Sequence, residues 1–420
     1  MRILRLVVCL LLLGSPVYAQ GVAVVQSAAP TSNGGTQDFT VSGFGTAVCA
    51  MFFLSYGTTN GTAATHAMVS VGFSDFTNHR GIGVSLESTG GATDTGAVRS
   101  IGGVISLLSL DQTQDGVATA STITDGVRLT WSDAPPSAYL VTAVMFNSTV
   151  FSNCAVGTLT LAGIVDTTAS VSGLGWQPDV ILGLYAASTM NARVSWGAAL
   201  NDGGVVQYSQ ALGATNANTT SDTYSRVVNN RISYNATELG ADGEVTSFDS
   251  GGFTVTSRTG TSVVSDLYYL TAKLAPGMSA KLTTCSSPTV TGAHSCTGAG
   301  FTPQAAIMLH SNVTALNTAS VSTTNSEIFG ISAFTGSAAG SVMGWMDDNT
   351  ATTGSESMAD TKPVRLRKDS ADYMTATLTG WQSDGADFNY TTTDSSARIR
   401  PILFFKAVSV RPMGRPIMFQ

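Results

Sequence analysis

The chain repeats itself three times, and this repetition constrains its fold more than any other feature of the sequence. The first marker of each copy is a Gly-x-Gly turn followed by an apolar run: VSGFGTAVCAMFFLS from Val41, VSGLGWQPDVILGLY from Val171 and CTGAGFTPQAAIMLHS from Cys296. Glycine permits the tight turn, and proline is tolerated at the start of a strand. The copies recur about every 125–135 residues, which is enough for each to bury a core of its own.

Two further markers follow in the same order in every copy. One is a turn and strand: ITDGVRLTW from Ile123, FDSGGFTVT from Phe248 and QSDGADFNY from Gln382. The other is a closing apolar strand: YLVTAVMFN from Tyr139, LYYLTAKLA from Leu267 and PILFFKAVS from Pro401. Between the markers, short β-branched and apolar runs alternate with clusters of turn-forming residues. We therefore predict an all-β chain of three tandem, jelly-roll-like β-sandwich domains that arose by internal triplication.

The markers also suggest the domain boundaries. We expect β-sandwich repeats at residues 20–150, 151–276 and 277–408, followed by an extended C-terminal tail at 409–420. Residues 1–19 combine two arginines, an apolar run and small residues, which is the pattern of a secretory signal peptide. The mature chain is therefore expected to be exported, and none of its runs is apolar enough to span a membrane.

Composition limits the partners that the chain can attract. Charged residues make up only 11% of the chain and the formal net charge is −7. Such a chain offers no positive field for nucleic acid or an anionic membrane. We expect neither of these partners, and no cofactor is indicated.

Four cysteines remain once the predicted signal peptide is removed. An even number in an exported protein allows two disulfides. Cys285 and Cys296 bracket a loop that contains proline and glycine, which favours a bridge between them. Cys49 sits in an apolar run, where pairing with Cys154 and a buried free thiol are both open.

The stretch DSGG at residues 249–252 matches the residues around the nucleophile of chymotrypsin-like proteases. It occupies the place of the Asp-Gly turn in the other copies, with the serine interpreted as an insertion. A protease would also need a base and an orienting carboxylate. His294 belongs to another copy and follows the serine in the chain. No catalytic residue is predicted.

No metal site is predicted either. The four histidines are not spaced as ligand pairs. Asp347 and Asp348 in WMDDNT offer oxygen ligands but lack the alternating spacing of a calcium loop, so a calcium role stays an open alternative. Other acids, among them Asp111 and Asp115, lie in turns, and a turn role explains them.

Aromatic residues near the repeat turns are the candidates for a ligand site, because an aromatic face can stack on a sugar ring. Trp131 and Trp381 adjoin the Asp-Gly turns, and Trp176 follows the second Gly-x-Gly turn. A basic strand offers positive charge for an anionic glycan through Arg365, Arg367 and Lys368. The alternative interpretations are packing at the sandwich ends for the tryptophans and an exposed strand face for the basic residues.

The phrases GFTPQAAIMLHS and GLGWQPDVILGLY, each followed by an Asp-Gly turn and an aromatic closing strand, resemble repeats in virion surface proteins of tailed bacteriophages. The resemblance covers the framework of the second and third copies and, less closely, of the first. It implies a structural or host-contacting role and no known catalytic residues. The signal peptide departs from this family, whose members are mostly assembled in the cytoplasm, and leaves room for a bacterial surface or secreted protein.

We therefore expect a non-enzymatic exported structural or surface protein, a component of a virion or of an extracellular assembly. Its expected partners are copies of itself or other surface proteins. A carbohydrate-binding adhesin is the alternative, and a glycan hydrolase is a third hypothesis. An enzyme should show one copy with an enlarged polar insertion that holds converging acids, and we find no such insertion. A lectin should show one face rich in exposed aromatics, and a structural protein should show apolar or strand-edge surfaces that bury on assembly.

Overall fold

The structure is a computed structural model that describes residues 21–89, 92–109, 111–187, 191–215, 223–234, 242–259, 264–320, 327–346, 354–368 and 371–406. Every regular element in these ranges is a β-strand, so the prediction of an all-β chain is confirmed. No helix in this part of the chain could cross a membrane. The predicted signal peptide, the tail at 409–420 and Asp347 and Asp348 lie outside the described residues.

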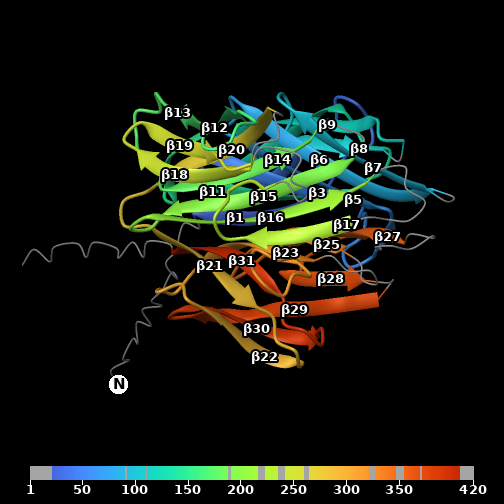
Figure 1. The fold of residues 1–420 in the computed structure, drawn as a ribbon. Helices are drawn as coiled ribbons and strands as arrows, with labels where there is room; N and C mark the ends of the chain where they lie inside the picture. The colour runs from blue at the N-terminus through green and yellow to red at the C-terminus, as the bar shows by residue number, and fades with distance from the viewer. Residues whose placement is uncertain are drawn as a thin grey trace, which may run out of the picture.

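Three stretches of chain, which we call the first, second and third units, supply these strands (Figure 1). The first unit contains β1 (Val22–Ala28), β2 (Thr36–Thr40), β3 (Ala47–Ser55), β4 (Ala64–Thr65), β5 (Ala67–Ser74), β6 (His79–Thr89), β7 (Ala92–Ser100), β8 (Ile105–Leu108), β9 (Gln114–Ile123), β10 (Gly126–Asp133) and β11 (Leu140–Asn147). The second unit contains β12 (Phe151–Leu161), β13 (Thr168–Val171), β14 (Val180–Ala186), β15 (Ala192–Asn201), β16 (Val205–Ala214), β17 (Thr223–Val228), β18 (Gly243–Asp249), β19 (Gly252–Ser257) and β20 (Ser265–Leu274). The third unit contains β21 (Ser279–Ser286), β22 (Gly292–Thr297), β23 (Ala305–Ser311), β24 (Ala319–Ser320), β25 (Glu327–Thr335), β26 (Ala339–Met346), β27 (Ser355–Asp360), β28 (Val364–Lys368), β29 (Ala371–Gln382), β30 (Gly385–Thr392) and β31 (Ile399–Lys406).

Each unit builds one larger and one smaller antiparallel sheet. The larger sheets have the orders β1-β11-β3-β5-β6-β7, β12-β20-β14-β15-β16-β17-β24 and β21-β31-β23-β25-β26-β27-β4. The smaller sheets have the orders β2-β10-β9-β8, β13-β19-β18 and β22-β30-β29-β28. In every unit the closing apolar strand lies between the first strand and the strand that follows the Gly-x-Gly turn.

Two short strands leave their own unit and complete the larger sheet of another. β4 of the first unit pairs with β27 of the third, where Thr65 lies opposite Glu356. β24 of the third unit pairs with β17 of the second, where Ala319 lies opposite Arg226. The second and first units meet through Thr93, whose hydroxyl donates to a carbonyl at the end of β16, 2.7 Å away. Each unit therefore contacts both of the others, and the three do not form a linear rod.

The larger sheets face one another across a single apolar core that takes residues from all three units. Phe146, Phe151 and Phe405, one from each unit, meet there with ring centroids 4.7 to 5.9 Å apart. The smaller sheets cover the outer faces, and each closes a separate core within its own unit. Figure 1 shows the smaller sheets at the periphery, with β18 and β19 at the upper left, β8 and β9 at the upper right and β28 to β30 at the bottom.

This two-layer burial explains two different sequence patterns. Strands β3 and β5 of the larger sheet are buried on both faces, which is why they read as nearly continuous apolar runs. Strand β2 of the smaller sheet alternates exposed and buried residues, because only one of its faces meets the core.

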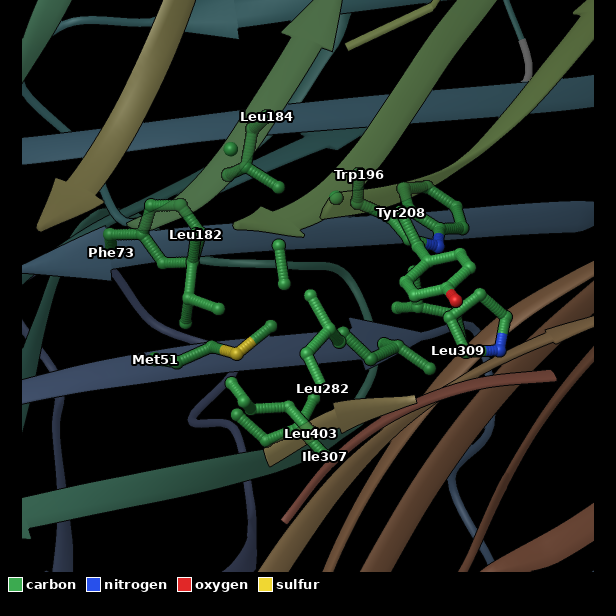
Figure 2. Close-up of a pocket in the computed structure, with 15 residues that line it drawn as sticks. Met51, Phe73, Leu182, Leu184, Trp196, Tyr208, Leu282, Ile307, Leu309 and Leu403 are labelled. Carbon is green, nitrogen blue, oxygen red and sulfur yellow. The ribbon is translucent and has the colours of Figure 1, made fainter. Parts of the chain in front are cut away.

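A small cavity remains where the three larger sheets meet (Figure 2). Its walls are apolar side chains of all three units, among them Met51, Leu182, Trp196, Ile307 and Leu403. Its volume of about 20 Å³ is room for about one water molecule, and an apolar gap of this kind gives water no hydrogen-bond partners. We interpret it as a packing gap of the shared core rather than a ligand site.

The Gly-x-Gly and Asp-Gly markers, far apart in sequence, contact each other. In the first unit the Asp125 carboxylate accepts hydrogen bonds from the backbone N–H groups of Gly43 and Gly45, at 3.1 and 2.9 Å. Asp384 does the same for the two glycines of the third unit, Gly298 and Gly300. All four glycines have positive φ, which presents both N–H groups to one carboxylate at little steric cost. We call this arrangement the aspartate clamp.

The second unit lacks the clamp, and the structure corrects how its DSGG turn aligns with the others. Asp249 pairs with Gly252 at the end of a two-residue turn, just as Ile123 pairs with Gly126 in the first unit. Ser250 is therefore not an insertion, and Gly251 stands where the other units have aspartate. The carbonyl of Gly251 accepts a hydrogen bond from the backbone N–H of Leu174 in the Gly-x-Gly loop. The Asp249 carboxylate accepts from the hydroxyl of Thr254 in its own hairpin.

Two disulfides join the layers and the units. Cys285 and Cys296 are bonded, as predicted, and link the two sheets of the third unit through β21 and β22. Cys49 of β3 is bonded to Cys154 of β12, so the pairing that the sequence left open joins the first unit to the second.

The aspartate clamp predicts that Gly45→Ala destabilises the protein, although an added Cβ meets no atom within 4 Å. The φ of +80° at Gly45 costs an L-residue about 1–2 kcal/mol. Gly102→Ala is the matched control, since its Cβ also enters open space and its φ is not in the positive region. Urea unfolding should show the loss for Gly45→Ala only, and equal stability of the two variants would contradict the interpretation.

The two disulfides should differ in their contribution to stability. The sequence separation is 105 residues for Cys49–Cys154 and 11 for Cys285–Cys296. The chain-entropy model gives about 5 kcal/mol for the longer loop and about 3 kcal/mol for the shorter one. Denaturant unfolding of Cys49→Ala/Cys154→Ala should therefore show the larger loss, with Cys285→Ala/Cys296→Ala as the comparison. A larger loss from the second pair would refute the expected order.

Candidate functional site

The predicted ligand-binding tryptophans lie in three different units and do not form one site. Trp131 is fully buried in the core of the first unit, where its indole N–H donates to Gln37 at 3.2 Å. Trp176 is half-buried in the loop before β14. Trp381 is half-buried on β29, stacks on Phe334 with centroids 5.7 Å apart, and lines a cleft of about 400 Å³ between the first and third units.

The basic strand β28 is part of an ion-pair network rather than a free positive surface. Arg365 lies 2.9 Å from Asp360 and 3.2 Å from Asp372. Arg367 lies 3.2 Å from Glu356, and its other nitrogen lies 3.5 Å from Asp372. The side chain of Lys368 lies outside the part of the chain whose side chains are described. The acids next to both arginines neutralise the charge that a glycan would need.

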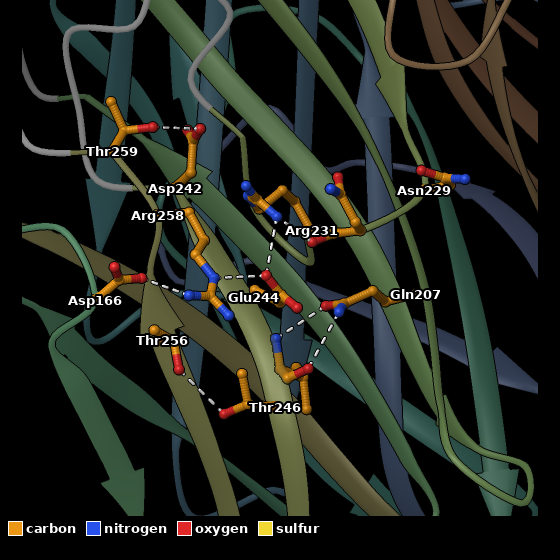
Figure 3. A network of polar contacts seen from close by, with 12 residues as sticks. Asp166, Gln207, Asn229, Arg231, Asp242, Glu244, Thr246, Thr256, Arg258 and Thr259 are labelled. Atoms are coloured by element: carbon orange, nitrogen blue, oxygen red, sulfur yellow. Dashed lines mark hydrogen bonds and ion pairs between the residues drawn. The ribbon is translucent and has the colours of Figure 1, made fainter.

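A second polar network, in the second unit, is also internally balanced (Figure 3). Glu244 on β18 accepts from Arg258 at 2.7 Å and from Arg231 at 3.0 Å. The side chain of Gln207 on β16 donates to the carbonyl of Val245 on β18 and accepts from the N–H of the same residue. These contacts tie the smaller sheet to the larger one, so we assign the network a structural role.

A third feature, a cleft of about 630 Å³ in the first unit, combines aromatic and acidic side chains. We call it the tyrosine cleft. Tyr56, which follows β3, and Tyr139, which precedes β11, form one wall, with ring centroids 5.2 Å apart. Asp111, in the turn between β8 and β9, Asp115, at the start of β9, and His66 also line the cleft. The remaining lining residues are small or carry hydroxyl groups: Thr58, Ala63, Ala64, Thr65, Ser109, Pro136 and Ser137.

The local structure fixes most of these side chains. Tyr56 is 8% exposed and its hydroxyl donates to the carbonyl of Leu108. Asp111 accepts from the hydroxyl groups of Ser109 and Thr113, which lower its carboxyl pKa. His66 has a φ of 71° and follows β4, so the pairing of β4 with the third unit holds it in position. The cleft thus depends on two units.

A buried carboxyl group, Glu87, lies against this cleft. It is 2% exposed, and one of its oxygens lies 3.5 Å from the Nδ1 atom of His66. The other oxygen, Oε2, is buried without a hydrogen-bond partner. Burial, and then the nearby Asp94 and Asp111, raise the pKa of Glu87 to about 7. Glu87 is therefore partly protonated at neutral pH.

Two further acids near the cleft, Asp94 and Asp115, also have raised pKa values. Burial, followed by the charge of Asp111, raises the pKa of Asp94. Burial also raises the pKa of Asp115, with further contributions from Asp133 and Asp111. Burial lowers the pKa of His66, so the imidazole is mostly neutral at pH 7 and does not offset these charges.

The tyrosine cleft was not identified from the sequence. Asp111 and Asp115 looked like turn residues, and the other groups come from separate segments of the chain. The one available signal was copy-specific: the first copy places a tyrosine directly after its apolar run and another directly before its closing strand. In the described residues, no group of three or more His, Cys, Asp or Glu side chains is arranged to hold a metal ion.

No protein-family model matches the chain, and a comparison with curated proteins finds no relative. The site is therefore interpreted from its own chemistry. Its contents, a pair of aromatic rings beside uncompensated acids, suit a ligand that brings apolar surface, hydrogen-bond donors or positive charge.

The Glu87 carboxyl group should make stability depend on pH. Because its folded-state pKa is raised from 4.5 to about 7, the folded state holds the proton more tightly, and stability should fall as pH rises through this window. Glu87→Gln removes the titration while keeping the shape. Melting temperatures measured from about pH 5 to about pH 8 should fall less steeply for Glu87→Gln than for the unmodified protein. Parallel curves for the two proteins would rule out this role.

Proposed function

We propose that the chain is an exported, non-enzymatic structural protein that works on the surface of a virion or in an extracellular assembly. The observation that carries this proposal is the architecture, in which three units share one core and complete one another's sheets. Such a body resists deformation, because no unit can move without opening the core or breaking strand pairing. Self-association or contact with other surface proteins would use its outer faces.

Two further features support the proposal. The matching strand orders of the three units support an origin by internal triplication, while the jelly-roll description of each unit stays a prediction. The two disulfides fit a protein that works in an oxidising environment outside the cell. The resemblance to tailed-phage virion repeats points to the same role.

A carbohydrate-binding adhesin is the second candidate, and the Trp381 cleft favours it. The indole N–H of Trp381 is buried without a hydrogen-bond partner, and Phe405 lines the same cleft. A sugar could supply an acceptor for this N–H and a face for stacking. The Trp381 cleft would then be the glycan-binding site, in place of the basic strand β28.

The structural proposal is tested by locating the protein in a culture that produces it. Antibodies raised against the mature chain would be used for immunogold electron microscopy of a producing culture. We expect regular label on particles or filaments, because a structural component is present in many ordered copies. Label confined to cell surfaces, or protein found only free in the medium, would contradict the proposal and make glycan binding the next assay.

A further inference from the structure

We infer that the tyrosine cleft of the first unit binds an organic ammonium ion, a role that goes beyond the structural function proposed above. The cleft is a cavity with chemically distinct walls rather than a group of acids alone. Its volume of about 630 Å³ lies in the range of small-molecule sites.

The charges in and behind the cleft favour a positively charged ligand. Two aspartates, Asp111 and Asp115, line it, and none of the described lining residues is a lysine or an arginine. Behind the wall, Glu87 lies against His66 with one oxygen that is buried and has no hydrogen-bond partner. The raised pKa values of Glu87 and Asp115 have burial as their main cause, with like-charge repulsion adding to it. A cation would relieve this repulsion, whereas an anion would add to it.

The aromatic wall selects an organic cation over a bare metal ion. Tyr56 and Tyr139 form a pair of rings at the cleft, and Tyr139 is only half-buried. An ammonium group is attracted to such faces, and its carbon substituents bury apolar surface against them. Ser109 and Ser137, also in the lining, offer hydroxyl oxygens to N–H or O–H donors of the ligand. A neutral sugar would stack on the rings but would leave the carboxyl groups uncompensated.

The residues that form the cleft come mainly from one of the three units, as expected of a ligand site rather than of a shared structural element. The acids and both tyrosines of the cleft belong to the first unit, while the third unit contributes the strand β27 that pairs with β4. A feature needed only for the shared architecture would be expected to recur in all three units. The tyrosine cleft is therefore a specialisation of one copy.

Choline is a suitable probe, because 3,3-dimethyl-1-butanol has the same shape without the charge. Isothermal titration of the mature exported chain should show saturable choline binding that is at least about tenfold tighter than binding of the neutral analogue. Asp115→Asn and Tyr139→Leu should each weaken choline binding by about tenfold. Asp202→Asn is the matched control, since it removes one exposed acid of the second unit that pairs with Lys281.

Three results would overturn the inference: no saturable choline binding, equal affinity for the neutral analogue, or unchanged affinity in Asp115→Asn. Tighter binding of methyl β-glucoside than of choline would also overturn it and assign the cleft to neutral sugars. Thermal unfolding of each variant separates loss of the site from loss of the fold. These results do not depend on where the protein is located, so they stand apart from the test of the structural proposal.

Discussion

Backbone pairing across unit boundaries is the interaction on which the rest of this structure depends. A sheet edge leaves N–H and C=O groups without partners, and such edges pair with whatever strand is offered. Here β4 and β24 supply that strand to β27 and β17. Each is only two residues long, so flanking bonds reinforce them, such as the one from the N–H of His66 to the carbonyl of Ser355. The same segment forms part of the tyrosine cleft, so the architecture and the candidate site share one support.

Because the three units share one core, the stability of each unit depends on the other two. Three phenylalanines, one from each unit, pack against one another in this core, and the larger sheets bury both of their faces. A unit removed from its neighbours would expose one whole apolar face of its larger sheet to water. The smaller sheets are different, because each closes a separate core inside its own unit. Local opening is therefore expected to begin in the outer layers rather than at the centre.

The sequence predicted the repeated elements well because they obey local rules. Apolar runs, glycine turns and Asp-Gly hairpins predicted the strands, and a short Pro- and Gly-containing loop predicted the Cys285–Cys296 bridge. Contacts between the units escaped prediction. Strands of two residues have no periodicity, and nothing local distinguishes a cysteine that pairs within its unit from Cys49, which pairs outside it. The acids of the tyrosine cleft had a sufficient local explanation as turn residues, so their convergence became visible only in three dimensions.

The donated strands also bear on how the chain assembles during folding. A segment that completes the sheet of a similar unit could equally complete that sheet in a second molecule, which is the route to domain-swapped oligomers. Within one chain, the connecting residues hold donor and acceptor at an effective concentration of about millimolar, far above that of free protein. In dilute solution, strand pairing within one chain is therefore favoured over pairing between chains. A high local concentration of nascent chains shifts the balance towards strand exchange between molecules. Slow, dilute folding favours the single molecule, and the Cys49–Cys154 bridge then fixes two of its units together.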